Sequence, residues 1–387
     1  MRLVLLTALT IIFDGFDNQL LGLALPSIMQ DWGLARSGFA PIVSLSYVGM
    51  MIGGAAAGRA GDRLGRRTAL LGSVLIFGVT TAVISLSGGP TSLAVLRFIA
   101  GVGLGGAIPN AAALAAEYVP VDRRPLAVTI TIVCVPLGGT LAGLFAVPAL
   151  TAVGWRGAFA IGGIVPAVTA LILFRVLPES PHYVRDAAGP LNMLIGREFR
   201  RDTIALWAAF LSCLLAVYLC FSWLPTLLSS AGLGSAVAST GLTLFNLGGV
   251  AGALLGGALI ARFGSKRTML TMAAGAVLGT MTMSRMTIGG AESVLPWLAM
   301  LTIAGGFINA VQTTMYALAA QVYPTMLRAT GVGAASAVGR SGAILSGYAG
   351  PWALDRGGAA SFFLLMAMTL TVTLASLAIV RRHVPGR

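Results

Sequence analysis

The sequence predicts an all-α integral membrane protein with twelve transmembrane helices, arranged as two pseudo-symmetric bundles of six. Of its 387 residues, 57% are hydrophobic and 10% are charged, and the mean hydropathy is +0.90. A soluble domain carries about 25% charged residues, so this composition excludes a soluble protein. Apolar runs of about 20 residues, the length that a bilayer-spanning helix needs, recur along the whole chain.

Short polar or glycine-rich turns separate these apolar runs, as expected for helices that satisfy their own backbone hydrogen bonds in lipid. Cys134, Cys213 and Cys220 fall inside the runs at no metal-ligand spacing, so we interpret them as apolar core residues. We predict spans at residues 3–29, 38–57, 68–87, 91–118, 125–148, 155–177, 203–229, 237–261, 268–287, 292–321, 328–352 and 358–380.

The Lys and Arg residues are distributed unevenly between the turns. With the N-terminus in the cytosol, 19 of the 25 fall on the cytosolic side, whereas Arg36, Arg156, Arg285 and Arg356 fall on the other. This asymmetry follows the positive-inside rule and predicts a multi-pass protein of the bacterial inner membrane with both termini cytosolic. It accounts for the net charge of +13 without a nucleic-acid partner. We expect a monomer in contact with lipid.

The chain repeats one pattern in its two halves. "DRLGRR" (62–67) is echoed by "ARFGSKR" (261–267), and "IAG…ALAAEYVPVDRR" (99–124) is echoed by "IAG…ALAAQVYPTMLR" (303–328), 204 residues later. Parallel repeats of this kind place a substrate site at their interface near the bilayer midplane. We predict an N-terminal six-helix bundle over 1–178, a cytosolic linker over 179–202 and a C-terminal six-helix bundle over 203–387.

Two motifs carry a family resemblance. "GRAGDRLGRR" (58–67) resembles the loop signature of the major facilitator superfamily, which implies that Gly58, Asp62, Arg63 and Arg67 latch the halves on the cytosolic side. In the second copy Ala261 replaces the Asp. "DGFDNQLLGLALPSIMQDWG" (14–33) is similar to the first-helix signature of the aromatic acid:proton symporter family. The segments 96–118, 177–181, 222–228 and 323–344 resemble the same family.

Asp14 and Asp17 lie deep inside the first predicted span. A carboxylate at the bilayer centre costs about 2.5–3.5 kcal/mol on insertion scales, and intramembrane ionisable groups most often mark ion or substrate paths. Spaced i and i+3, the two acids share one helical face. Two carboxylates in a medium of low dielectric constant cannot both ionise cheaply. We therefore interpret Asp14 and Asp17 as proton-coupling residues.

Two arginines match these acids by depth. Counted at a rise of about 1.5 Å per residue, Arg97 lies level with Asp17, and Arg340 lies level with Asp14. Because a guanidinium binds a carboxylate bidentately, we interpret Arg340, and Arg97 after it, as ligands of an anionic substrate. The alternatives are structural salt bridges and, for Arg97, a side chain that extends to the membrane interface.

Other polar residues within the spans are candidates for a substrate cavity, because the resemblance implies that the helices holding most of them line the path. The Tyr and Trp residues have an alternative role as interface anchors. Glu117, Arg124 and Arg328 are candidates for a cytosolic gate together with Gly58, Asp62, Arg63 and Arg67. The lining candidates are Asn110, Tyr218, Trp223, Asn246, Asn309, Gln312 and Tyr316.

The residues and the resemblance together predict a secondary transporter that imports a small aromatic carboxylate, such as a hydroxybenzoate or benzoate, with protons by alternating access. We expect no metal and no cofactor, with the proton gradient as the energy source. A proton-coupled carrier of another organic anion, such as nicotinate or a dicarboxylate, is the alternative, and a drug:proton antiporter is a third. An enzyme would need clustered His, Cys or acidic residues, which the spans do not contain.

Overall fold

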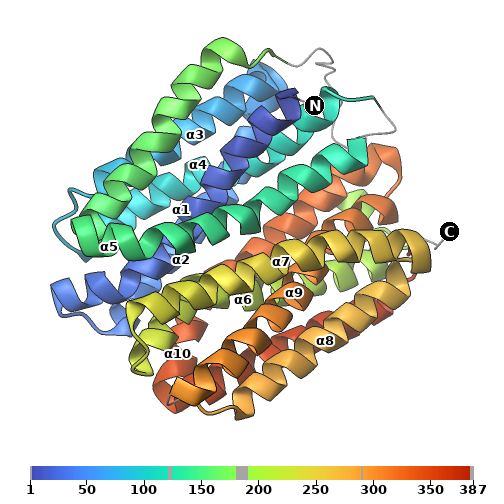
Figure 1. Cartoon of the computed structure of the whole chain (residues 1–387). Coiled ribbons are helices and arrows are strands. Elements are labelled where there is room, and N and C mark those ends of the chain that lie inside the picture. The colour runs from blue at the N-terminus through green and yellow to red at the C-terminus, as the bar shows by residue number, and fades with distance from the viewer. Residues whose placement is uncertain (1, 121–123, 180–190, 289–290, 384–387) are drawn as a thin grey trace. The chain divides into compact units, whose positions relative to one another are not determined.

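The computed structural model describes residues 2–120, 124–179, 191–288 and 291–383. These residues are helical apart from short connections, as the sequence predicts for an all-α protein (Figure 1). The elements are α1 (Arg2–Trp32), α2 (Arg36–Leu64), α3 (Arg66–Ile84), α4 (Pro90–Glu117), α5 (Arg124–Val176), η2 (Leu191–Ile195), α6 (Arg200–Ser230), α7 (Ser235–Phe263), α8 (Ser265–Arg285), α9 (Ala291–Val322) and α10 (Thr325–Ile379).

Two elements, α5 and α10, each consist of two helices joined at glycine, and Figure 1 shows each as two rods that meet at an angle. In α5 the break is at Gly154, with φ 66° and ψ −179°. In α10 it is at Gly357 and Gly358, the second with φ 57°. A residue with a side chain rarely adopts positive φ, so glycine permits these reversals. The breaks fall between predicted spans 125–148 and 155–177, and between 328–352 and 358–380.

Nine helices within the described residues are long and apolar enough to cross a membrane. The segments Thr330–Ile379, which contains the break at Gly357 and Gly358, and Arg200–Ser230 are among them. The first helix of α5 is represented by a shorter apolar stretch, Ile130–Phe145, and α8 is not among the nine. The prediction of a multi-pass membrane protein is confirmed at this level, whereas the count of twelve spans remains a prediction.

By their internal contacts the residues form two compact units. Unit 1 comprises Met1–Arg185 and Phe221–Thr243, and unit 2 comprises Asp186–Cys220 and Leu244–Arg387. The boundaries fall within α6 and α7, so each of these helices contributes one part to each unit. In unit 1, α1 to α5 pack against one another. In unit 2, α8, α9 and α10 do so, and η2 contacts α10.

The segment Phe221–Thr243 is joined to the rest of unit 1 by small residues and hydroxyl groups. The hydroxyl oxygens of Tyr47 and Ser222 are 2.7 Å apart and buried. The Ser239 hydroxyl donates to the carbonyl oxygen of Gly143. A Cβ atom at Gly22 would lie 2.2 Å from the carbonyl oxygen of Phe221, so this contact requires glycine.

Helix packing shows the same repeat that the sequence predicts. In unit 1, α2 lies so close to α4 that a Cβ atom at Gly53 would be 2.0 Å from the carbonyl oxygen of Val102. In unit 2, a Cβ atom at Gly252 on α7 would be 2.1 Å from the carbonyl oxygen of Gly306 on α9. Small residues allow such close approach between helices in lipid. The corresponding glycines of the two repeats therefore form equivalent backbone contacts.

The position of α1 in unit 1 is set by a similar contact with α5. Cβ atoms at Gly15 and Gly138 would each lie 2.1 Å from a carbonyl oxygen of the other helix, those of Val135 and Ile12. Because Gly15 lies between the two acids of α1, this contact fixes the rotation of the helix where the charged side chains leave it.

Candidate functional site

The charged centre of unit 1 is built by three helices around Asp17. On α1, Asp17 accepts a hydrogen bond at Oδ2 from Nη1 of Arg97 on α4, over 3.1 Å. Its other oxygen, Oδ1, accepts a hydrogen bond from the Thr81 hydroxyl on α3, over 2.6 Å. The side chains of Asp17 and Thr81 are 0% exposed and that of Arg97 is 1% exposed. Both carboxylate oxygens of Asp17 thus receive a donor from a neighbouring helix.

This arrangement confirms the pairing of Arg97 with Asp17 that depth predicts. A buried pair of opposite charges avoids the cost of leaving either charge alone in an apolar environment. The Nε atom of Arg97 is also buried, and it makes no hydrogen bond to the described residues. Arg97 therefore neutralises Asp17 while keeping a further donor.

Asp14 lies one helical turn before Asp17 on α1 and is 0% exposed. Its spacing from Asp17 places both carboxylates on one side of the helix. The matching of Arg340 with Asp14 by depth concerns residues of different units, and it stays a prediction.

Unit 2 contains a second buried guanidinium. Nη1 of Arg340 on α10 donates to the Tyr218 hydroxyl on α6 over 2.7 Å. The guanidinium carbon lies 5.8 Å from the centre of the Tyr218 ring, within the range of a cation–π interaction. Tyr218 is 5% and Arg340 9% exposed. The structure therefore brings together two residues that the sequence singles out separately.

Two predicted cavity residues, Asn110 and Asn309, donate hydrogen bonds to backbone carbonyl oxygens. Asn110 is buried and donates its amide hydrogens to the carbonyl oxygens of Ala57 on α2 and Gly106 on α4, over 3.1 and 2.9 Å. Asn309 is buried and donates to the carbonyl oxygen of Gly305 over 2.9 Å. The bond from Asn110 to Ala57 joins α4 to α2, whereas that of Asn309 stays within α9. Sequence position alone does not reveal either partner.

The remaining predicted lining residues belong to both units. Trp223 is buried within unit 1, and Asn246 is buried within unit 2. In unit 2, Tyr316 packs edge-on against Phe210 with ring centres 5.0 Å apart. Gln312 is half-buried on the same helix.

At the predicted cytosolic end of unit 1, Arg67 interacts with the last turns of α5 and with the segment that follows it. Its backbone N–H donates to Oε1 of Glu179 over 2.9 Å, and its guanidinium donates to the carbonyl oxygen of Phe174. The hydroxyl of Thr68 donates to Oε2 of Glu179 over 3.3 Å. Glu179 therefore supplies a cap to the N-terminus of α3, which begins after Gly65 and has no cap of its own.

The other gate candidates differ in how far they are exposed. Arg63 is exposed, and Gly58 and Glu117 are half-buried. The side chains of Asp62, Arg124 and Arg328 lie outside the described part of the chain.

Several titratable groups beyond the ends of the apolar helices have shifted pKa values, among them Tyr118 and His383. Burial, with a smaller contribution from the charge of Glu179, raises the pKa of Tyr118 to about 12. The Tyr118 hydroxyl donates to the carbonyl oxygen of Pro178. In unit 2, burial lowers the pKa of His383 below its usual 6.5, and the charge of Lys266 lowers it further. Nδ1 of His383 lies 3.0 Å from the Ser265 hydroxyl oxygen.

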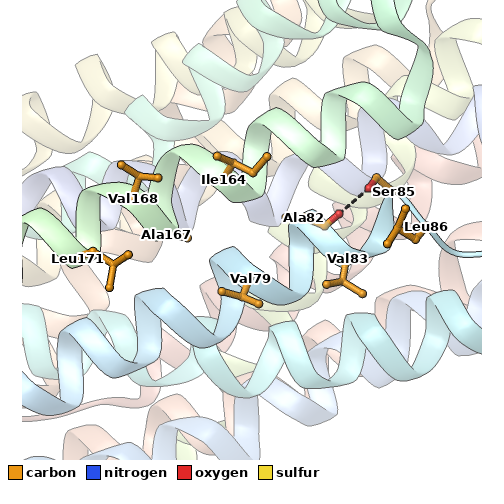
Figure 2. Close-up of a pocket in the computed structure, with 9 residues that line it drawn as sticks. All are labelled: Val79, Ala82, Val83, Ser85, Leu86, Ile164, Ala167, Val168 and Leu171. Atoms are coloured by element: carbon orange, nitrogen blue, oxygen red, sulfur yellow. Dashed lines mark hydrogen bonds between the residues drawn. The ribbon is translucent and has the colours of Figure 1, made fainter.

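Two surface cavities lie on unit 1, and neither is lined by the buried pair of Asp17 and Arg97. One is an apolar groove of about 350 Å³ between α3 and the second helix of α5, lined by residues such as Val79, Val83 and Val168 (Figure 2). The other, of about 420 Å³, is lined in part by Asp31, Trp155 and Arg156. Arg156 pairs with Asp31 over 2.9 Å. None of the residues predicted to bind substrate lines either cavity.

Sequence reasoning missed Thr81 and Glu179 as partners of predicted site residues. The only sequence signal for Thr81 is a pair of threonines in the middle of an apolar helix. Glu179 carries a stronger one, because it lies in the "LPESP" segment directly after α5.

Long apolar helices with buried charged residues, in a chain with an internal repeat, define a membrane transport protein. The model of the Major Facilitator Superfamily matches residues 7–346 and 229–387. The chain belongs to the major facilitator superfamily, and within it to the group of aromatic acid transporters described next. Its relatives are transporters, in agreement with the expectation that it is not an enzyme.

Curated relatives match over most of their length. The gallate transporter of Pseudomonas putida is 34% identical over 389 residues, covering 92% of this chain and 86% of that protein. The 4-hydroxybenzoate transporter PcaK of Pseudomonas aeruginosa is 32% identical, with 92% and 86% covered. The benzoate transport protein of Acinetobacter baylyi is 29% identical, with 92% and 83% covered.

Solved structures show the same fold at lower identity. The structure titled D-xylose-proton symporter matches with a TM-score of 0.79 and 18% identity, covering 99% of this chain and 97% of that one. The partially occluded, inward-open xylose transporter XylE from E. coli matches with a TM-score of 0.77 and 18% identity, covering 96% and 95%. At this identity the likeness concerns the fold.

Proposed function

We propose that this protein imports a small aromatic carboxylate together with protons by alternating access. The proposed substrates are hydroxybenzoates and benzoate, in keeping with the gallate, 4-hydroxybenzoate and benzoate for which its relatives are named. Its energy source is the proton gradient, with no cofactor. Asp14 and Asp17 couple protons to transport.

One observation carries the substrate class, namely the buried pair of Arg340 and Tyr218. The guanidinium offers planar donors for a carboxylate, and the adjacent phenol ring offers an apolar face for an aromatic ring. The 2.7 Å hydrogen bond from Nη1 to the Tyr218 hydroxyl holds the guanidinium beside that ring. An aromatic acid offers a carboxylate to the guanidinium and a ring to the phenol, whereas an aliphatic dicarboxylate has no ring to offer.

The proposed topology has twelve spans in two bundles, 1–178 and 203–387, joined by a cytosolic linker, 179–202. The helix breaks at Gly154 and at Gly357 and Gly358 support this count, because each divides a long element into two spans. The excess of Lys and Arg on one side supports cytosolic termini in a bacterial inner membrane. We propose that the protein works as a monomer.

We propose roles for the other candidate residues as well. Arg97 is a second substrate ligand through its buried Nε. The residues that border the path are Trp223, Asn246, Gln312, Tyr316, Asn110 and Asn309. Asn110 also joins α4 to α2 through its bond to the carbonyl oxygen of Ala57. Gly58, Asp62, Arg63, Arg67, Glu117, Arg124 and Arg328 form the cytosolic gate.

The test is uptake by proteoliposomes that contain the purified protein. With an acidic outside buffer, labelled 4-hydroxybenzoate should accumulate, and a protonophore should abolish the accumulation. Excess unlabelled benzoate should compete, whereas succinate, which represents the dicarboxylates, should compete weakly. Competition by nicotinate stronger than that by benzoate would favour the nicotinate alternative. Accumulation that persists with the protonophore would exclude proton coupling, and stronger competition by succinate would favour a dicarboxylate carrier.

A further inference from the structure

Asp17 has a second partner besides Arg97. The Thr81 hydroxyl donates to Oδ1 of Asp17 over 2.6 Å, and both side chains are completely buried. We propose that Thr81 is a positioning residue of the proton-coupling site, whose hydroxyl holds the Asp17 carboxylate toward Arg97 and sets the pH at which this carboxylate takes up a proton. The inference rests on the proposed role of Asp17 in proton coupling.

The hydrogen bond of Thr81 departs from that of most buried threonines in these helices. Thr80, its neighbour, donates to the carbonyl oxygen of Ile76 on its own helix over 2.6 Å. Thr131 and Thr280 likewise donate to carbonyl oxygens four residues earlier. This local bond is the usual choice for a buried hydroxyl in a helix. Thr81 instead gives its single donor to an acid on another helix.

The chemistry of the two groups makes this bond sensitive to protonation. A hydroxyl has one hydrogen to donate, and an ionised carboxylate accepts hydrogen bonds at both oxygens. The bond from Thr81 therefore stabilises the ionised form of Asp17. When a proton binds Oδ1, the hydroxyl can no longer donate to that oxygen, although it can accept from the new O–H. Its own hydrogen can then turn to the carbonyl oxygen of Phe77, four residues earlier on the same helix. Thr81 thus has one arrangement for each charge state of Asp17.

Few other charged groups in unit 1 lie on the helices that pack against α1 and could influence the protonation of Asp17. α1 packs against α3, α4 and α5. α3 has no charged residue between Thr68 and Ile84, and α5 has none over 125–155. α4 contributes Arg97, and α1 itself contributes Asp14. The segment of α6 that contacts Gly22 of α1, residues 221–230, has no charged residue. Within unit 1, therefore, three groups remain that can influence the protonation of Asp17, namely Arg97, Asp14 and the Thr81 hydroxyl.

The experiment compares four proteins: wild type, Thr81→Val, Thr81→Ser and Thr80→Val. Valine removes the hydroxyl at nearly constant shape, and serine keeps it. Thr80→Val is the matched control because it deletes a hydroxyl one residue away that bonds to backbone. Infrared difference spectra at stepped pH report the C=O band of the protonated carboxyl group, and Asp17→Asn identifies the band that belongs to Asp17.

In Thr81→Val the ionised carboxylate loses a donor, so Asp17 should keep its proton to higher pH. We expect the midpoint of its band to rise by about one pH unit, a tenfold change in proton affinity. Thr81→Ser should stay near wild type, and Thr80→Val should match it. An unchanged midpoint in Thr81→Val, an equal rise in Thr80→Val, or a carboxyl band that Asp17→Asn leaves intact would overturn the inference. If Thr81→Val does not fold, Thr81→Ala provides a second deletion of the hydroxyl.

Uptake measured on the same proteins separates this inference from the proposed function. The pH at which 4-hydroxybenzoate uptake is half-maximal should rise in Thr81→Val by the same amount, while KM for the acid stays within about twofold. If wild type transports the acid but the carboxyl band has the same midpoint in Thr81→Val as in wild type, the proposed role of Thr81 is wrong. The proposed transport function is then unaffected. If the band moves but wild type transports no aromatic acid, Thr81 does position Asp17 and the proposed function is wrong.

Discussion

Nη1 of Arg97 lies 3.1 Å from Oδ2 of Asp17, and the two side chains are 1% and 0% exposed. The pair joins α4 to α1 within unit 1 and leaves no net charge at this point. Removing one partner of a buried ion pair is strongly destabilising because it leaves the other charge uncompensated.

A double-mutant cycle should reveal this coupling. We expect Arg97→Gln and Asp17→Asn each to lower stability by about 3–5 kcal/mol. The double variant should recover part of the loss, with a coupling energy of about 1–3 kcal/mol. Unfolding in mixed detergent micelles measures these values. Strictly additive effects would mean that the two groups do not depend on each other.

The acid pair of α1 predicts a separation between two modes of transport. Asp14→Asn or Asp17→Asn should abolish accumulation driven by a proton gradient, because the amide of asparagine neither takes up nor releases a proton. At least one of them should retain counterflow exchange of labelled against unlabelled acid, which requires no net proton movement. Normal accumulation by both variants would place the proton carrier elsewhere.

Arg340 and Tyr218 predict recognition of a carboxylate beside an aromatic ring. Calorimetry should show that wild type binds 4-hydroxybenzoate much more tightly than its uncharged amide. Arg340→Lys keeps the charge but loses the planar fork of donors, so it should weaken acid binding by about tenfold, and Arg340→Ala should nearly abolish it. Tyr218→Phe keeps the ring and serves as the milder comparison. Equal binding of acid and amide by wild type would contradict this role.

The cap of α3 by Glu179 predicts a local effect on this helix. Glu179→Ala removes the acceptor of the Arg67 N–H and of the Thr68 hydroxyl. The loss should be about 1 kcal/mol, the usual contribution of an N-cap, and should appear as faster amide exchange over residues 66–69. Glu198→Ala, which removes an exposed acid paired with Arg382 in unit 2, is the control. Equal exchange of this segment in both variants would rule out the cap.

His383 predicts a dependence of stability on pH. Because its pKa in the folded protein lies below 6.5, the unfolded chain binds the proton first as the pH falls. Folding stability should therefore be unaffected by His383 above about pH 7.5 and should decrease below about pH 6.5, until the folded pKa is passed. His383→Gln should melt like wild type at high pH and at higher temperature than wild type in acid. A pH-independent difference would contradict the shift.

Much of the architecture is encoded locally. The helix limits follow from apolar runs and glycine breaks, so most predicted spans begin and end close to an observed helix end or glycine break. An exception is α2, which continues to Leu64, past the predicted end at residue 57. Depth along a straight helix is a property of sequence position, because each residue advances about 1.5 Å. For this reason Asp17 and Arg97, which lie on helices that are far apart in sequence, could be matched before any contact was known.

What only the tertiary structure decided is which groups the polar side chains choose as partners. Thr80 and Thr81 are adjacent and chemically identical, yet one bonds to its own backbone and the other to Asp17. Asn110 is a candidate cavity residue by sequence, and only the structure shows that its amide also joins α4 to α2. A rotation of about 100° per residue separates neighbouring side chains on a helix. Partner choice therefore depends on how each helix is turned, and close glycine contacts such as that between Gly15 and Val135 set that rotation.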